Sequence, residues 1–445
     1  MNDFDFAAVD WGQAFWTIAA AALSSVSCAL LGCYLVLRRM SLLGDAISHA
    51  ILPGIAVAFW FGGTTAALPM FLGAVAVGLL TAALTETLHR AGNVPEDAAM
   101  GVVFTSLFAL GVVMIARLSA GRIDLDPDCV LYGRIEHVLL ETRTVLGREI
   151  PLAMFPLGTT LLATALFIGA CWKELKIASF DPALATAMGL SAGVVHYLLM
   201  GMVAVASVAA FDSVGSVIVV AMLIVPAAAA HLLADRLGPM LAWAAGIAFL
   251  SAVLGYLGAV YFNTVVAGMM AIVVGLEFTL AVLLAPRHGL VSRAWHRLDL
   301  ALRIVSEDII ARLYRAEEGR AEEGRAEESH LAGPSIGQPA GSGGFTAWLG
   351  LRRLLRRGDV KRAPDRSLRL TEQGRLAAQS LVRSHRLWEA YLGEHFDLPL
   401  DHLHEPAERV EHFIGPQLQE RLASELARPG VDPHGKEIPP SDHKS

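Results

Sequence analysis

Histidine and carboxylate residues near the end of the sequence recur at spacings that suit a bound metal ion. An expected helix over residues 381–392 would present His385 and Glu389 on one face, because they lie four positions apart. A second helix starting near residue 405 would carry Glu408, Glu411 and His412 on one side. Imidazole nitrogens and carboxylate oxygens converging from two helices suit Mn²⁺, Fe²⁺ or Zn²⁺, whereas a lone histidine-rich helix is usually a solvated face. The six potential ligands are His385, Glu389, His404, Glu408, Glu411 and His412.

A second set of polar residues lies inside strongly apolar stretches. Asp45 and His49 are four residues apart, so one helix face would hold a carboxylate and an imidazole, which also suit Mn²⁺, Zn²⁺ or Fe²⁺. The alternative is a structural hydrogen-bonded pair at a helix end. Asp212 lies in the polar stretch 211–216, which predicts a helix break, and its carboxylate could face a pore or cap the next helix. Because polar groups are costly in hydrocarbon, all three are candidate functional residues.

The elements that must position these residues are divided between two unlike halves of the chain. The first 290 residues hold 30 charged side chains, and the last 155 hold 47. This contrast excludes a single soluble globular domain. Four cysteines in 445 residues, with no CxxC, also exclude a disulfide scaffold. Runs of about 20 apolar residues are long enough to cross a membrane as helices. Nine such spans are expected: 13–37, 43–62, 66–88, 98–116, 151–172, 192–210, 213–233, 239–261 and 264–285.

The expected fold class is mainly α: a polytopic helical membrane protein with about nine spans and a small, mostly α, winged-helix-like and dimerisation domain. Basic residues gather in alternate short loops, which places the N-terminus outside and the C-terminal half in the cytoplasm. Three parts are expected. Residues 1–290 form the transmembrane domain, 291–344 hold a first helix, a charged repeat and a Gly/Ser linker, and 345–445 form the cytoplasmic domain.

A short helix is expected in the loop after the fifth span. Asp181 and Pro182 supply a helix start, and Gly189 supplies a stop. A short helix on the cytoplasmic face could dock an ATPase, or it could be a surface connector.

The membrane half resembles the permease subunits of manganese, zinc and iron ABC importers. The matching stretches are Ser41–Gly54, Glu96–Leu107, Phe180–Leu190 and Phe211–Ala230, in the same order over about residues 10–288. The resemblance implies that Asp45 and His49 line the metal path, and we place Asp212 with them. It also implies that 180–190 is the helix that contacts the ATPase. We expect this contact from Phe180, Asp181, Pro182, Ala185 and Gly189.

The cytoplasmic half begins with features typical of a winged helix. Residues 348–357 predict a basic amphipathic helix, and 359–370 predict a hairpin with its turn at 363–367. Such a surface could contact nucleic-acid phosphates or anionic lipid head groups, or could be solvated. Before it lie a charged five-residue repeat at 316–328 and a Gly/Ser/Pro-rich linker at 332–344.

The last hundred residues resemble the iron- or manganese-dependent repressors of the diphtheria-toxin-repressor type. The matching stretches are Leu370–Arg375, Arg383–Glu389, His404–His412 and Asp432–Pro439. The resemblance implies that the six residues from His385 to His412 are metal ligands, together with Asp308 in a first helix at 306–314. Glu408 stands where iron-type members have Cys, which favours manganese. Ala311 stands where manganese-type members have a further acid. The repeat and linker replace the helix-turn-helix, which counts against sequence-specific DNA binding.

The resulting hypothesis is the permease subunit of a bacterial inner-membrane ABC importer for Mn²⁺, or for Zn²⁺ or Fe²⁺, with a cytoplasmic metal-sensing tail. The sequence contains no GxxxxGK[ST] phosphate loop, so the chain itself is not expected to be an enzyme and the ATPase is a separate subunit. The other expected partners are an extracytoplasmic metal-binding protein, a second permease copy or paralogue, and membrane lipid. No permanently bound cofactor is expected. The alternatives are a membrane-tethered, metal-responsive DNA-binding regulator and a permease for a metal chelate such as a siderophore.

Overall fold

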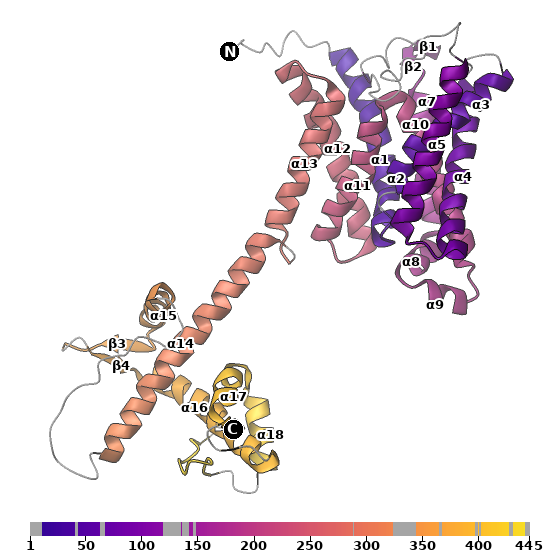
Figure 1. The fold of residues 1–445 in the computed structure, drawn as a ribbon. Coiled ribbons are helices and arrows are strands. Elements are labelled where there is room, and N and C mark those ends of the chain that lie inside the picture. The colour runs from indigo at the N-terminus through magenta and orange to yellow at the C-terminus, as the bar shows by residue number, and fades with distance from the viewer. Residues whose placement is uncertain are drawn as a thin grey trace. The chain divides into compact units, whose positions relative to one another are not determined.

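The computed structural model describes residues 11–40, 43–62, 67–118, 135, 142–145, 148–287, 289–323, 344–364, 367–396, 399, 402–426 and 430–440. The chain divides into two compact units, Met1–Arg293 and Ala294–Ser445, and each is described by itself. Both are mainly helical (Figure 1), as the sequence predicts.

The membrane unit is a bundle of apolar helices (Figure 1). Its elements are α1 Trp11–Leu37, α2 Leu43–Ala50, α3 Leu52–Gly62, α4 Ala67–Gly92, α5 Glu96–Leu118, β1 Thr142–Val145, β2 Arg148–Pro151, α7 Met154–Ala170, α8 Trp172–Phe180, α9 Pro182–Ala187, α10 Ala192–Val214, α11 Ser216–Leu233, α12 Leu237–Phe262 and α13 Val266–Leu284. Helices α1, α11, α12 and α13 pack on one another, and α3, α4 and α5 form a second group. Close packing depends on small residues: a Cβ on Gly32 of α1 would lie 1.7 Å from the carbonyl oxygen of Leu223 in α11.

The expected count of nine spans is not confirmed. Among the described residues, six helices are long and apolar enough to cross a membrane, or seven if α7 and α8, bent by 75°, form one broken span. The expected span 43–62 is divided into α2 and α3, because Pro53 lies in the first turn of α3 and cannot donate a backbone hydrogen bond to continue α2. The expected span 213–233 starts at Ser216, after Gly215 with φ of 89° breaks the chain from α10.

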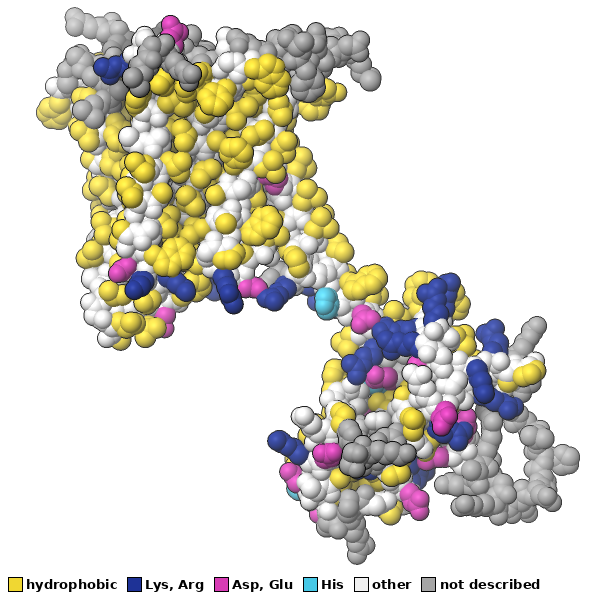
Figure 2. Space-filling model, turned by 180° about the vertical axis from the view of Figure 1, so that it is seen from behind, with side chains coloured by type: hydrophobic (Ala, Val, Ile, Leu, Met, Phe, Trp, Pro, Cys, Tyr) yellow, Lys and Arg dark blue, Asp and Glu magenta, His cyan; other side chains and the backbone are white. Residues whose placement is uncertain are grey.

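The surface of this bundle matches a membrane environment. Figure 2 shows hydrophobic side chains over the sides of the bundle and Lys and Arg side chains gathered at one end. Exposed large apolar residues lie on several of the long helices, including Leu72, Val102, Leu162 and Leu276. Helices α8 and α9 lie at one end of the bundle, and the β1–β2 hairpin lies at the other (Figure 1).

The C-terminal unit is built around α16, which spans Glu372–His395. The other elements are α14 Leu290–Glu323, α15 Gly344–Arg357, β3 Val360–Arg362, β4 Leu368–Leu370, α17 His404–Val410, the 3₁₀ helix η4 Glu411–Phe413 and α18 Pro416–Glu425. The basic helix and the antiparallel hairpin are as predicted, with Val360 opposite Leu370. One core joins α14, α15, the hairpin and α16 through Ile310, Leu354 and Ala378. A second core joins α16 to α18 and the C-terminal turn through Leu387, Leu422 and Ile438.

Candidate metal centre

Helix α16 carries the first two candidate ligands and begins at a well-defined cap. The Thr371 side chain accepts a hydrogen bond from the backbone N–H of Gly374 at 3.1 Å, which satisfies one of the unpaired donors of the first helical turn. From that start, His385 and Glu389 fall four residues apart on the buried face of the helix, as predicted. Both side chains are almost completely buried, at 4% and 3% exposure.

Three ligand atoms converge where α17 begins. His385 Nε2 lies 3.1 Å from Glu389 Oε1 and 3.0 Å from His404 Nδ1, and His404 Nδ1 lies 2.9 Å from the same Glu389 oxygen. We call these three residues the nitrogen-rich group. Their ligand atoms lie within 4.8 Å of one another, close enough to hold one ion.

A second group forms between α14 and η4. His412 Nε2 lies 3.2 Å from Asp308 Oδ1 and 4.0 Å from Glu411 Oε1. We call Asp308, Glu411 and His412 the oxygen-rich group, since it offers two carboxylates and one imidazole within 4.8 Å of one another. Carboxylate ligands suit Mn²⁺, whereas imidazole-rich sets suit Zn²⁺ and Fe²⁺.

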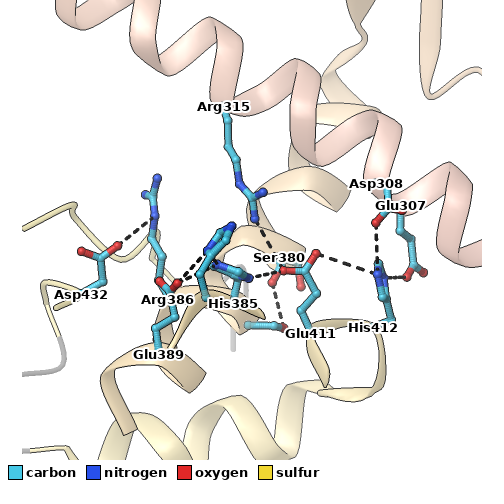
Figure 3. Close-up of polar contacts among 12 residues, drawn as sticks. Glu307, Asp308, Arg315, Ser380, His385, Arg386, Glu389, Glu411, His412 and Asp432 are labelled. Carbon is cyan, nitrogen blue, oxygen red and sulfur yellow. Dashed lines mark hydrogen bonds and ion pairs between the residues drawn. The ribbon is translucent and has the colours of Figure 1, made fainter. Parts of the chain in front are cut away.

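The two groups meet through one pair of buried side chains. His385 Nδ1 lies 2.5 Å from Glu411 Oε2 (Figure 3). Nε2 of the same ring contacts Glu389 and His404. His385 Nδ1 and Glu411 Oε2 are buried and make no hydrogen bond of good geometry to any described residue. Arg315 of α14 adds a positive charge, with its Nη2 3.6 Å from Glu411 Oε2. The burial of these side chains and the chemistry of their donor atoms fit a divalent metal at both groups.

The charges in these groups shift the proton affinities of their members. Burial would raise the pKa of Glu389, but hydrogen bonds and charge from His385 and His404 lower it to about 2. Burial would lower the pKa of His412, but hydrogen bonds to Asp308 and Glu307 and the surrounding negative charge raise it to about 9. The pKa of His385 is also raised, because its contacts with Glu389 and Glu411 outweigh burial. Without metal, protonated imidazoles therefore balance the carboxylates in both groups.

Two residues differ from the sequence-based interpretation of the second cluster. Glu408 is exposed and belongs to neither group, although it was expected to share a face with Glu411 and His412. The reason is that α17 ends at Val410 and the chain tightens into η4, which turns Glu411 and His412 inward. Glu307 was not predicted, yet its Oε2 lies 2.8 Å from His412 Nδ1. Its position directly before the predicted ligand Asp308 is the sequence feature that could have predicted this contact.

The predicted metal-path residues lie on short or broken helices of the membrane unit. Asp45 and His49 fall on α2, and Asp212 falls near the end of α10. The side chains of all three lie outside the part of the chain that the structure describes. Their role therefore stays a prediction.

The predicted ATPase-contact residues form a compact corner between α8 and α9. Asp181 Oδ1 accepts a hydrogen bond from the backbone N–H of Leu184 at 2.9 Å and so caps α9, and Pro182 is the first residue of that helix. Ala185 is buried, and Gly189 ends the segment with φ of 80°. Phe180, at the end of α8, is 60% exposed. The helix start and stop agree with the sequence prediction, and the contact itself stays a prediction.

Family models match both units. Residues 12–285 match the ABC 3 transport family, and residues 371–440 match the iron dependent repressor, metal binding and dimerisation domain. The second match contains α16, α17, η4 and α18, and therefore every member of the nitrogen-rich group.

Named relatives and a solved structure match the membrane unit. The manganese transport system membrane protein MntD of Bacillus subtilis (strain 168) is 48% identical over 286 residues, which cover 64% of this chain and 96% of the relative. The zinc transport system membrane protein TroD of Treponema pallidum (strain Nichols) is 38% identical over 319 residues, covering 71% of this chain and 87% of the relative. The structure of PsaBC from Streptococcus pneumoniae in complex with Fab aligns with a TM-score of 0.53 and 32% identity, over 63% of this chain and 94% of that chain.

Proposed function

Because the chain belongs to the ABC 3 transport family, we propose that it is the permease subunit of an ATP-driven importer of divalent transition-metal ions in a bacterial cytoplasmic membrane. Mn²⁺ is the preferred cargo in this proposal, with Zn²⁺ and Fe²⁺ as the alternatives. The observation that carries the proposal is the match over nearly the whole membrane unit to proteins named for manganese and zinc transport.

The permease acts with other subunits. The sequence holds no phosphate-binding loop, so ATP hydrolysis belongs to a separate ATPase and not to this chain. The α8–α9 corner is the surface for that ATPase, because Phe180 at the end of α8, Leu184 in α9 and Met188 just after α9 are exposed apolar side chains. An extracytoplasmic binding protein delivers the ion, and a second permease copy or a paralogue completes the path.

Inside the membrane, Asp45, His49 and Asp212 act as transient ligands along the path. A carboxylate and an imidazole four residues apart on α2 can replace part of the hydration shell of the ion. Their position on a short helix that breaks at Ile51 suits a site that must release the ion. An Asp45→Ala change that leaves uptake intact would remove this assignment.

The C-terminal unit acts as a cytoplasmic metal sensor that slows import when metal accumulates. Both ligand groups lie within this unit, on the side of the membrane where imported metal arrives. Binding at these groups regulates transport only if the unit has two states with different contacts to the transporter. When bound, an ion at the nitrogen-rich group would join α16 to α17, and an ion at the oxygen-rich group would join α14 to η4.

Uptake of radiolabelled Mn²⁺ and Zn²⁺ tests both parts of the proposal. The full-length chain is compared with a chain truncated after Arg293, each with the cognate ATPase and binding protein, in cells that lack their own importers. The full-length chain should slow as internal metal rises, while the truncated chain should continue. If transport by both forms continues unchanged at high internal metal, the C-terminal unit is not a sensor that slows import. If neither form takes up metal at all, the permease assignment is wrong.

A matched pair of point variants separates metal sensing from truncation effects. Glu389→Gln removes a buried carboxylate of the nitrogen-rich group, whereas Glu405→Gln changes an exposed carboxylate one residue after His404 that lies outside both groups. Only Glu389→Gln should keep import fast at high internal metal.

A further inference from the structure

Helix α15 presents one exposed face that mixes large apolar side chains with arginines. Five positions of the helix fall within about 100° of one another around its axis, because 3.6 residues make one turn. Three of the five side chains are apolar, two are basic, and all five are exposed. We call these residues the α15 face: Phe345, Trp348, Arg352, Leu355 and Arg356.

The opposite side of α15 packs against α14, which fixes the direction of the α15 face (Figure 1). Gly350 and Leu354 are buried there, and a Cβ on Gly350 would lie 3.1 Å from Cγ1 of Val305 in α14. Arg353 Nη1 lies 2.7 Å from Asp299 Oδ1 of the same helix. Because these contacts hold α15, the helix cannot turn its exposed apolar residues inward without losing them.

The apolar and basic side chains of the α15 face are in contact with one another. Phe345 is 70% exposed and Trp348 is 52% exposed, and their rings stack with centroids 6.1 Å apart. The Arg352 guanidinium lies 5.2 Å from the centroid of the Trp348 ring. Exposed aromatic rings gain free energy in an apolar phase, while a guanidinium favours phosphate. The boundary between the head groups and the acyl chains of a bilayer offers both.

The hairpin that follows α15 adds positive charge. Lys361 of β3 lies directly opposite Arg369 of β4, and both side chains are exposed. Like charges directly opposite each other on a hairpin repel. A surface of negative charge against this hairpin would reduce that repulsion, so the hairpin also suits an anionic partner.

The chain tethers α15 to a helix that can cross a membrane. Helix α13 ends at Leu284, and Asp299, which pairs with Arg353 of α15, follows fifteen residues later. A short tether raises the effective concentration of the bilayer, so that weak contacts suffice. Nucleic acid would have to bind from solution. Its phosphates would contact arginines, but they would give exposed Phe345 and Trp348 no apolar surroundings.

We propose that the α15 face binds the surface of a bilayer that contains anionic phospholipid. The three apolar side chains enter the head-group region, and Arg352 and Arg356 contact lipid phosphates. This inference goes beyond the proposed function. It requires that the membrane unit lies in a bilayer, and it requires neither metal binding nor transport.

Amide hydrogen exchange of the full-length protein in lipid nanodiscs tests the proposal. One set of nanodiscs holds phosphatidylcholine alone, and the other also holds about 30% phosphatidylglycerol, a common anionic phospholipid. Exchange in residues 344–357 should be about 10-fold slower in the anionic nanodiscs, because binding to the surface suppresses opening of the helix. Raising the salt concentration to about 1 M should reduce this difference by screening the arginines.

A double variant with a matched control tests the arginines. Arg352→Gln with Arg356→Gln should abolish the difference between the two kinds of nanodisc. Arg409→Gln with Arg421→Gln removes the same charge from exposed positions on α17 and α18 and should preserve the difference. All four side chains are exposed, so none of the substitutions opens a cavity in the fold.

Tryptophan fluorescence gives a second readout. The protein has eight tryptophans, so the signal of Trp348 is taken as the difference between the parent and Trp348→Phe. Phospholipid brominated on its acyl chains quenches a tryptophan that enters the bilayer. The Trp348 signal should be quenched in the anionic nanodiscs and not in the neutral ones.

Three results would overturn the inference. The first is equal exchange in both kinds of nanodisc with Trp348 unquenched, which would mean that lipid does not cover the α15 face. The second is a difference that persists in the Arg352, Arg356 variant. The third is slower exchange on addition of double-stranded DNA at about 0.15 M salt without any effect of phosphatidylglycerol, which would assign the surface to nucleic acid. Because no measurement needs metal or ATP, a failure of the proposed transport would not affect them.

Discussion

The nitrogen-rich and oxygen-rich groups share one helical scaffold but present opposite ligand chemistry. The first takes His385 and Glu389 from α16 and adds the imidazole of His404 from α17. The second takes Glu411 and His412 from η4 and adds Asp308 from α14. The element that meets each pair therefore decides the ligand set. Helix α17 brings an imidazole nitrogen, and α14 brings a carboxylate oxygen.

Members of the two groups also differ in whether a proton must leave before a metal ion can bind them. Glu389 has a pKa of about 2, so it is already ionised at neutral pH. His412 has a pKa of about 9, so a metal ion that binds it must first release its proton. The pKa of His385 is raised as well, so both sites should release protons when metal binds, but their ligand sets predict different metal preference. The His385–Glu411 pair joins the two sites.

Disrupting the His385–Glu411 pair should have the largest effect on metal affinity. Glu411→Gln deletes a carboxylate of the oxygen-rich group and the partner of His385 Nδ1. Mn²⁺ affinity at the oxygen-rich group should fall about 100-fold, because a ligand is lost. Zn²⁺ affinity at the nitrogen-rich group should fall about 10-fold, because the ring of His385 loses the carboxylate in contact with its Nδ1. Mn²⁺ titration by electron paramagnetic resonance and Zn²⁺ competition measure the two effects.

Glu405→Gln is the matched control for this experiment, because Glu405 is an exposed carboxylate outside both groups. It should leave both affinities within about twofold of the parent. If Glu411→Gln lowers only Mn²⁺ affinity, the two groups are independent and the pair does not join them.

The next largest effect should be the pH dependence of Mn²⁺ affinity at the oxygen-rich group. His412 is protonated below its raised pKa of about 9, so each Mn²⁺ that binds releases one proton in that range. Mn²⁺ affinity should therefore rise about tenfold per pH unit between about pH 7 and 9 and then level off. Titrations at pH 7, 8 and 9 measure the slope, which His412→Gln should flatten. A slope of zero in the parent would show that His412 is not a ligand.

Local spacing predicted the parts of these groups that lie within one regular helix. His385 and Glu389 meet because α16 is continuous and four residues bring two side chains to one face. The same rule failed for Glu408, since it assumes a helix that continues, and α17 tightens into η4 at Glu411. Pairing across elements was beyond spacing alone. Glu307 and Asp308 are adjacent, and only the packing of α14 against η4 brings the first to Nδ1 and the second to Nε2 of His412.

The membrane unit shows the same limit in a different form. Apolar length predicted most of the long helices, because a run of about 20 apolar residues has few other stable conformations in hydrocarbon. It did not locate the break at Ile51, although Pro53 favours it. The break at Gly215 is confirmed, because the polar stretch 211–216 predicted it and Gly215 has φ of 89°. These breaks fall beside Asp45, His49 and Asp212, where departure from regular structure is most expected.

Glu307 offers a smaller test of the oxygen-rich group. Its Oε2 contacts His412 Nδ1, the ring nitrogen opposite the one that faces Asp308 and Glu411. It should therefore orient the ring and not bind the ion. Glu307→Gln should lower Mn²⁺ affinity about 10-fold and leave Zn²⁺ affinity unchanged. The same titrations measure both, and an equal loss for the two metals would point to a folding defect instead.

The smallest expected effect concerns the metal-free C-terminal unit. The pKa of His412 is raised to about 9 from 6.5, so its ion pairs stabilise the fold fully below about pH 6.5, and this stabilisation is lost as pH rises through about 9. Because the site is only partly shielded from solvent, the loss should be on the order of 1 kcal/mol. Glu389 behaves in the opposite sense: its lowered pKa stabilises the fold above about pH 4.5, and that contribution is lost as pH falls through about 2.

Amide hydrogen exchange of the full-length protein without metal, corrected for intrinsic rates, can follow this change along α16 and η4. Protection near His412 should decline between pH 7 and 9, and by more than protection near Glu389, whose own pKa of about 2 lies outside that range. The His412→Gln variant should show no decline. Equal losses of protection at both groups would mean that the two clusters share one titration, and the contrast between them would then lie in metal preference alone.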